Sequence, residues 1–205
     1  MNIQSKTSTP NINLELNFHP KETNFPSTSD FKLITDNNYP VYYDINNNYN
    51  KGYISITYKL CYIYNCTYGL LHGILPRNSK NAGYHEIDRE YIRILINKKT
   101  LKPEIVYFSA HDNEGKWVMW DKCEKNKNGD LKVFIAYCSH ANYPNSGTWC
   151  RIIFLGNDKC SINGRIILPK LIPEKFNLNI TNDDSKSSSL KNRLVSFIYL
   201  PYNKK

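Results

Sequence analysis

The sequence has 205 residues, of which 40% are hydrophobic and 13% aromatic, and this is enough apolar surface for the core of one domain. The 27 Lys and Arg against 18 Asp and Glu give a formal net charge of +9, which favours anionic partners such as nucleic acid or phospholipid without specifying one. The composition excludes a fibrous or wholly disordered chain. The longest uncharged run, Leu60–Pro76, contains polar residues and falls short of the roughly 20 apolar residues of a membrane-spanning helix, so no transmembrane segment is expected.

The first segment in chain order is polar. Residues 1–30 are rich in Pro, Ser, Thr and Asn and contain no apolar stretch typical of a secretory signal, so we predict a flexible arm and a cytoplasmic protein. Residues 36–50, with three consecutive Asn residues, are predicted to be a turn-rich lead into the fold. Residues 31–205 are expected to form a single domain, with a polar loop at 177–192 before a final strand.

From Gly52 onward, short runs of β-branched and aromatic residues alternate with turn signals such as Asn128-Gly129 and Asn163-Gly164. The predicted strands are Tyr53–Tyr64, Tyr91–Ile96, Ile105–Ser109, Trp117–Trp120, Val133–Cys138, Arg151–Leu155, Arg165–Leu168 and Val195–Leu200. No segment keeps a 3.6-residue apolar period for more than about two turns. The expected fold class is therefore all-β, an antiparallel β-sandwich with long polar loops and little helix, whose core extends from about Gly52 to Pro169.

Six cysteines are too few for a disulfide-rich scaffold, and none of them forms a C-x-x-C pair of the kind that binds structural zinc. Reduced thiols are the default expectation. Because the count is even, a disulfide such as Cys138 with Cys150 stays open.

The most unusual segment is 83–96. If its strand starts near Asp88, alternation places Asp88 and Glu90 on the same face as Ile92, Ile94 and Ile96, which is the face expected to point into the core. Buried carboxylates require a counter-charge, which a metal ion, an arginine or a shared proton would supply.

His85 lies three residues ahead of Asp88 and completes an H-x-x-D-x-E pattern, a mixed nitrogen and oxygen set suited to a divalent cation. The alternative is that the alternation is out of phase. In that case these residues are a solvated strand end whose carboxylates pair with Arg89 or Arg93.

Two other histidines follow apolar strands at their polar ends, where sandwich proteins build sites: His111 after 105–110 and His140 after 133–139. Each is a candidate site residue. The ordinary alternative is that each is a packing residue with satisfied hydrogen bonds.

Three ordered segments resemble the vacuolar protein sorting-associated protein 62 family: Tyr84–Glu90, then Val106–His111 with Gly115–Val118, then Ser139–Trp149. The resemblance extends over roughly residues 53–170 and includes Asn157-Asp158-Lys159. The first segment is also similar to one motif of the necrosis-inducing protein family, β-sandwich cytolysins in which a His, an Asp and a Glu help to hold a divalent cation beside a lipid head group.

These resemblances imply that His85, Asp88 and Glu90 are ligands of a divalent cation, whether Mg, Ca or Zn. They also imply four neighbouring site residues, which are His111, His140, Asn78 and Tyr143. The chain departs from the family pattern at Arg89, where the families have Trp, and at Asn78, which offers only a neutral oxygen near the place of an acidic ligand in the cytolysins.

The function expected first is a metal-supported binding module of the sorting type, peripheral to membranes, that recognises an anionic or sugar-bearing lipid head group. A metal-dependent hydrolase is the alternative, with the cation activating a water molecule and His111 or His140 as acid or base. A basic nucleic-acid-binding protein ranks third, since the Lys and Arg residues are scattered. The oligomeric state stays open.

Overall fold

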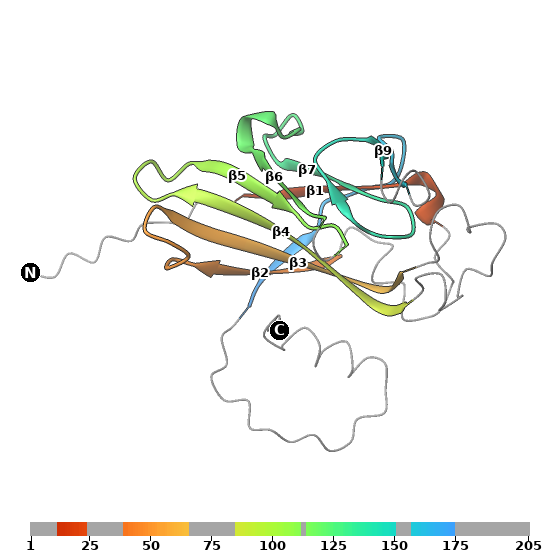
Figure 1. The fold of residues 1–205 in the computed structure, drawn as a ribbon, viewed down its shortest axis with the longest axis horizontal. Helices are drawn as coiled ribbons and strands as arrows, with labels where there is room; N and C mark the ends of the chain where they lie inside the picture. Colours follow the sequence, from red (N-terminus) through yellow and green to blue (C-terminus); the bar gives the residue numbers. More distant parts are fainter. Residues whose placement is uncertain (1–11, 24–38, 66–84, 112–113, 151–156, 175–205) are drawn as a thin grey trace, which may run out of the picture.

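The computed structural model describes residues 12–23, 39–65, 85–111, 114–150 and 157–174 (Figure 1). The strands are β1 (Leu14–Phe18), β2 (Pro40–Asn46), β3 (Tyr53–Asn65), β4 (His85–Asn97), β5 (Pro103–Phe108), β6 (Lys116–Met119), β7 (Leu131–Ile135), β8 (Asn142–Tyr143), β9 (Gly147–Trp149), β10 (Asp158–Cys160), β11 (Ile166–Ile167) and β12 (Lys170–Pro173). The short 3₁₀ helices η1 (Pro20–Thr23) and η5 (Trp120–Lys122) are the helical segments in this part of the chain. The all-β prediction is confirmed.

The strands form two main sheets and a small ribbon. The larger sheet has the order β12-β2-β3-β4-β5-β6, the smaller has the order β11-β1-β7-β8, and β10 pairs with β9. Most neighbours are antiparallel, whereas β1 with β7 and β12 with β2 are parallel. The central pair, β3 and β4, is the longest, with 13 residues in each strand.

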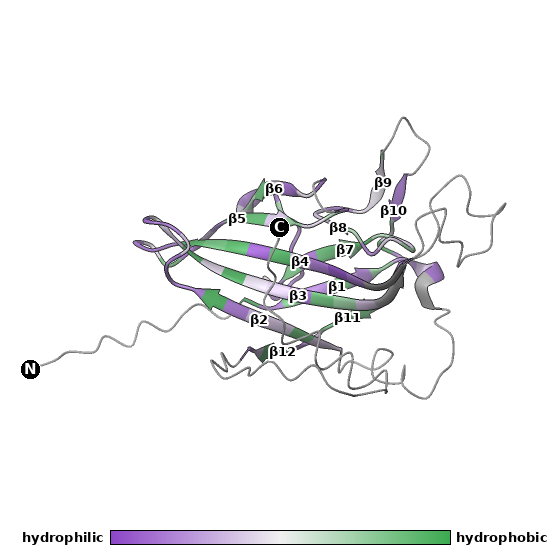
Figure 2. Cartoon of the chain, turned by 60° about the horizontal axis from the view of Figure 1, so that its bottom comes forward, coloured by the Kyte–Doolittle hydropathy of each residue, from purple (hydrophilic) through white to green (hydrophobic). Residues whose placement is uncertain are grey.

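One apolar core lies between the two main sheets. The larger sheet contributes Ile56, Tyr58, Leu60, Tyr62, Ile92, Ile94, Ile96, Val106 and Phe108, and the smaller contributes Leu14, Leu16, Phe18, Leu131, Val133, Ile135 and Ile167. The alternation of hydrophobic and hydrophilic residues along β3 and β4 is visible in Figure 2. Each fully buried aliphatic side chain of this core stabilises the fold by about 1.5–3 kcal/mol.

The period-two pattern predicted for the segment after Gly83 is confirmed for its described side chains. Asp88 and Glu90 are buried on the same face as Ile92, Ile94 and Ile96, whereas Arg89 between them is exposed. The strand begins at His85 rather than near Asp88, because β4 is paired with β3 as far as Asn65.

The prediction of a flexible arm over residues 1–30 is wrong for its described part. β1 runs parallel to β7 and antiparallel to β11 in the smaller sheet, and all five of its residues are buried. The strand was not predicted because its sequence contains the polar residues Glu15 and Asn17. In the fold these residues are satisfied: the Glu15 carboxylate accepts hydrogen bonds from Asn17 Nδ2 at 3.3 Å and from Asn126 Nδ2 at 2.9 Å. The rest of the arm, residues 1–11 and 24–30, lies outside the described residues.

The turn-rich lead predicted for residues 36–50 contains β2, so that prediction is corrected there. Between β12 and β3, β2 gains backbone partners on both sides, which its own short apolar pattern does not reveal. The predicted strands at 151–155 and 195–200 and the predicted loop at 177–192 lie outside the described residues.

The cysteines are not all thiols. Cys138 is disulfide-bonded, whereas Cys61, Cys123, Cys150 and Cys160 are free. The expectation of six reduced cysteines is therefore wrong, and the pairing of Cys138 with Cys150 is excluded. Among the described residues, no helix is long and apolar enough to cross a membrane.

Candidate functional site

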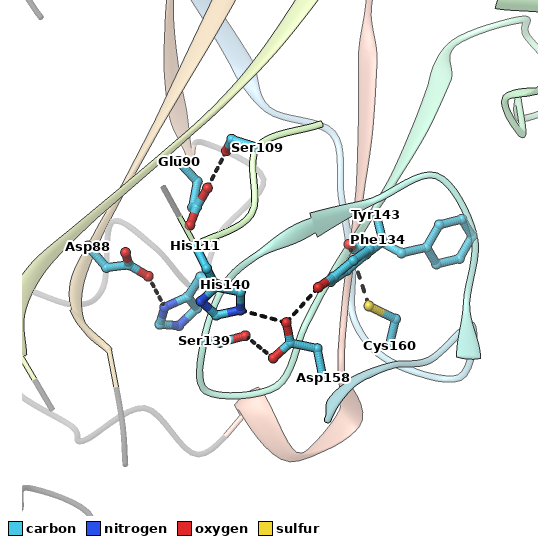
Figure 3. Close-up of polar contacts among 10 residues, drawn as sticks. All are labelled: Asp88, Glu90, Ser109, His111, Phe134, Ser139, His140, Tyr143, Asp158 and Cys160. Carbon is cyan, nitrogen blue, oxygen red and sulfur yellow. Dashed lines mark hydrogen bonds and ion pairs between the residues drawn. The ribbon is translucent and has the colours of Figure 1, made fainter. Parts of the chain in front are cut away.

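A cluster of buried polar side chains lies where the inner face of β4 meets the end of β5, the turn between β7 and β8, and β10 (Figure 3). Its members are Asp88, Glu90, Ser109, His111, Ser139, His140, Asn142, Tyr143 and Asp158. The strand ends bring these groups together although they are distant in sequence.

The first contact joins Asp88 and His140. The Nδ1 atom of His140 lies 3.0 Å from Oδ2 of Asp88, and the imidazole ring stacks on Tyr62 with 4.1 Å between ring centroids and 8° between the planes. His140 is 1% exposed. Its φ of 54° and that of Cys138, 69°, place both residues in the left-handed region, a conformation that costs about 1–3 kcal/mol per residue and often marks functional sites.

The second contact is centred on Ser109. Its hydroxyl donates to Oε2 of Glu90 and accepts from the Tyr91 backbone N–H at 2.7 Å and from Asn142 Nδ2 at 3.3 Å. Burial raises the pKa of Glu90 well above its usual range, and the negative charge of Asp88 raises it further. Glu90 and Asp88 therefore repel each other when both are ionised.

The third contact is centred on Asp158. Its Oδ2 lies 2.7 Å from Nε2 of His111 and accepts from the Tyr143 hydroxyl at 2.6 Å, while Oδ1 accepts from the Ser139 hydroxyl at 2.7 Å. Burial acts to raise the pKa of Asp158, but the hydrogen bonds from His111, Tyr143 and Ser139 outweigh it, so this pKa lies below its usual value. Asp158 thus ties β10 to the ends of β5 and β7.

The structure brings together five of the seven site residues expected from sequence: Asp88, Glu90, His111, His140 and Tyr143. His85 is the first residue of β4, in register with Asn65, and its side chain lies outside the described part, as does Asn78 altogether. The alternative of a solvated strand end is wrong, since Asp88 and Glu90 are 6% and 7% exposed.

Sequence reasoning assigned no role to Ser109, Ser139, Asn142 or Asp158. All four lie within or beside the motif segments, within two residues of His111 or His140 or in Asn157-Asp158-Lys159, and this proximity is the available signal. Buried hydroxyl, amide and carboxylate groups at strand ends need partners, so they gather with the histidines.

Among the described residues, no group of three or more His, Cys, Asp and Glu side chains is arranged to hold a metal ion. The buried Oδ1 of Asn142, however, has no hydrogen-bond partner in the described part of the chain. An orphaned oxygen beside the Ser109–Glu90 contact fits the oxygen chemistry of a hard cation.

No protein-family model matches the chain, and no curated protein matches it. A solved structure described as "Toxin fold for microbial attack and plant defense" is similar with a TM-score of 0.38 and 14% identity, over 65% of this chain and 51% of that chain. This chain thus spans about half the length of that structure, and so distant a likeness says nothing about what this chain does.

Proposed function

We propose that this protein is a binding module in which a divalent cation, held by Asp88, Glu90 and His85, organises a polar site for an anionic or sugar-bearing lipid head group. The observation that carries the proposal is the burial of two carboxylates, Asp88 and Glu90, on one face of β4. The resemblance to a sorting family supports the same reading.

The electrostatics of this pair support a cation. Two neighbouring buried carboxylates do not both stay ionised unless positive charge lies close to them. His140 is within hydrogen-bond distance of Asp88, while Glu90 receives only a hydroxyl hydrogen bond among the contacts described above. A bound cation would offset both the burial and the negative charge of Asp88, which together raise the pKa of Glu90.

The donor chemistry favours Mg or Ca over Zn. Beside the one nitrogen donor of His85, the two carboxylates and the amide oxygen of Asn142 are hard oxygen donors, which Mg and Ca prefer, whereas Zn prefers sites richer in nitrogen and sulfur. When bound, the cation would supply a fixed positive charge for a phosphate or sugar oxygen. The chain's own residues would orient it: Ser109 holds Glu90, and His140 holds Asp88.

Binding is favoured over hydrolysis by the positions of the two histidines. His140 is 1% exposed and His111 is engaged with Asp158, so both rings serve contacts within the fold. A general acid or base must reach the reacting group directly or through one water molecule. The structure therefore supports a holding role for these residues.

The test is titration calorimetry of chelator-treated protein with Mg, Ca and Zn chlorides. We expect Asp88→Asn and Glu90→Gln each to weaken cation affinity at least tenfold, about 1.4 kcal/mol, since each removes a charged ligand. Asp121→Asn is the matched control, because this carboxylate is 70% exposed and pairs with Lys122 at the surface. Equal affinities in the wild-type protein and the two site variants would contradict the cation site.

The same proteins are then sedimented with neutral vesicles, with vesicles containing phosphatidylserine, and with vesicles containing a glycolipid. We expect cation-dependent binding to one of the last two that Asp88→Asn abolishes. Cation binding without any vesicle binding would retain the metal site but reject the head-group ligand.

A further inference from the structure

The connection between β7 and β8 supplies side chains to two buried carboxylates of the site (Figure 3). The Ser139 hydroxyl donates to Oδ1 of Asp158 at 2.7 Å, and Nδ1 of His140 lies 3.0 Å from Oδ2 of Asp88. Directly before these two residues stands Cys138, which is disulfide-bonded. A reducible covalent bond therefore adjoins the two side chains that hold the carboxylates.

The backbone of this connection adopts a conformation that needs restraint. The φ angles of Cys138 and His140 are 69° and 54°, in the left-handed region that residues with a Cβ atom disfavour. The His140 N–H donates to the Ala136 carbonyl at 3.1 Å. The Ser139 N–H donates to the Tyr137 carbonyl at 2.8 Å. Each such bond contributes little by itself, so the covalent bond at Cys138 is the firmest restraint on the turn.

Cys138 is placed so that its release would loosen the turn and leave the core intact. It lies outside the strands on either side, which end at Ile135 and begin at Asn142. It belongs to neither of the two apolar clusters formed by the described residues. The other cysteines in the described part of the chain are free: Cys61, Cys123, Cys150 and Cys160. Reduction at Cys138 therefore acts on the turn rather than on the packing between the sheets.

A cation site is sensitive to a small movement of this turn. Bond lengths between a metal ion and its ligands vary by only about 0.2 Å, and ligands keep their positions through the groups that hydrogen-bond to them. His140 is such a group for Asp88. A turn that relaxes thus removes the support of a proposed ligand.

We propose that the disulfide at Cys138 is a redox switch of the cation site, an inference that rests on the function proposed above. The oxidised protein holds His140 against Asp88 and binds the cation. Reduction relaxes the turn and weakens cation binding. Because disulfides persist in oxidising surroundings, the site is strong there and is weakened in reducing ones.

The switching step is a thiol–disulfide exchange with a dithiol reductant. Cys138 is 6% exposed, so attack requires a local opening of the turn. The first thiolate of the reductant attacks one sulfur of the disulfide, which breaks the S–S bond and releases the other sulfur as a thiolate that takes up a proton. The second thiol of the reductant displaces the remaining cysteine sulfur, which is also protonated. Two electrons and two protons pass from the dithiol, which becomes a disulfide, to the protein, which gains two thiols.

The coupling between cation and disulfide acts in both directions. If the disulfide strengthens cation binding tenfold, the bound cation favours the disulfide over the two thiols by the same factor. For a two-electron couple, a tenfold change corresponds to about 30 mV. A redox titration with dithiothreitol, with and without saturating cation, measures this shift.

The main test is titration calorimetry with calcium or magnesium chloride on chelator-treated protein, with and without dithiothreitol. We expect reduction to weaken cation affinity about tenfold. Cys138→Ala should bind as weakly as the reduced wild-type protein and should not respond to dithiothreitol. Cys138→Gly also lacks the disulfide but should bind more tightly than Cys138→Ala, because glycine adopts a left-handed φ without a steric penalty. Cys150→Ser, which replaces a free and exposed thiol, is the matched control and should keep the full response.

Hydrogen exchange of the peptide covering residues 136–143, measured in EDTA, is the second readout. Reduction should speed exchange of the Ala136 and His140 amides, which are hydrogen-bonded within the turn. Residues 92–96 of the core strand β4 should keep their protection.

Equal cation affinity in the oxidised and reduced proteins would overturn the switch. So would a disulfide that reacts with dithiothreitol only when all strands lose protection together, since that is the behaviour of a purely structural bond. If the oxidised protein binds neither cation, the cation site itself is rejected, and the switch with it. Faster exchange confined to residues 136–143 would distinguish that result from a disulfide without effect on the turn, because the exchange is measured without free cation.

Discussion

At the scale of single residues, substitution of Asp158 is expected to destabilise the fold strongly. It accepts hydrogen bonds from Ser139 and Tyr143 and contacts His111, so Asp158→Asn removes a charged acceptor from buried donors and should lower the free energy of unfolding by about 1–3 kcal/mol. Because the folded-state pKa of Asp158 is lowered, this stabilisation is present above the unfolded pKa of about 3.9 and disappears as the pH falls through the lower folded value.

Urea unfolding of wild type and variant from pH 7 down to pH 3 measures this effect. The gap between the two should be largest near neutral pH and should shrink in acid. Asp121→Asn, a surface carboxylate, provides the control and should show little change at any pH. A gap that is absent at pH 7, or that widens in acid, would show that Asp158 does not hold the strand ends together.

At the scale of elements, β1 contributes more to the stability of the core than its polar sequence suggests. Leu16 is 0% exposed and pairs with Val133 of β7 and with Ile167 of β11. Leu16→Ala should therefore cost about 2–5 kcal/mol, the usual effect of a cavity in a core. Ile45→Ala in β2, a residue 40% exposed, should cost far less, and similar losses for both variants in thermal or chemical denaturation would argue against β1 as a core strand.

At the scale of the whole molecule, the stability of the fold depends on whether the disulfide at Cys138 is oxidised or reduced. With Cys138 in a disulfide and four cysteines free, the unfolded protein should bind maleimide at four thiols before reduction and at six after it. Reduction, or Cys138→Ser, should lower stability by about 2–4 kcal/mol, whereas Cys150→Ser should have little effect. Six reactive thiols without reductant would contradict the disulfide. Disulfides persist in oxidising environments, which weighs against the cytoplasmic location expected from the sequence.

The sequence alone determined the all-β class, the long strand at Tyr53–Asn65, the inner part of the strand His85–Asn97, and the inward direction of Asp88 and Glu90. These features follow from the period-two alternation of side chains in a strand, which is a property of the local backbone and is visible in a short window. The order of the motifs also predicted His111 and His140 as neighbours of these carboxylates.

Only the tertiary structure decided that Leu14–Phe18 is a core strand, that Pro40–Asn46 pairs on both sides, and that Asp158 is the acceptor for three separate segments. Short strands carry too few alternating residues to stand out, and their burial depends on partners distant in the chain. Hydrogen bonds such as His140 to Asp88, 52 residues apart, arise because two sheets pack their strand ends together, and no local pattern records that packing.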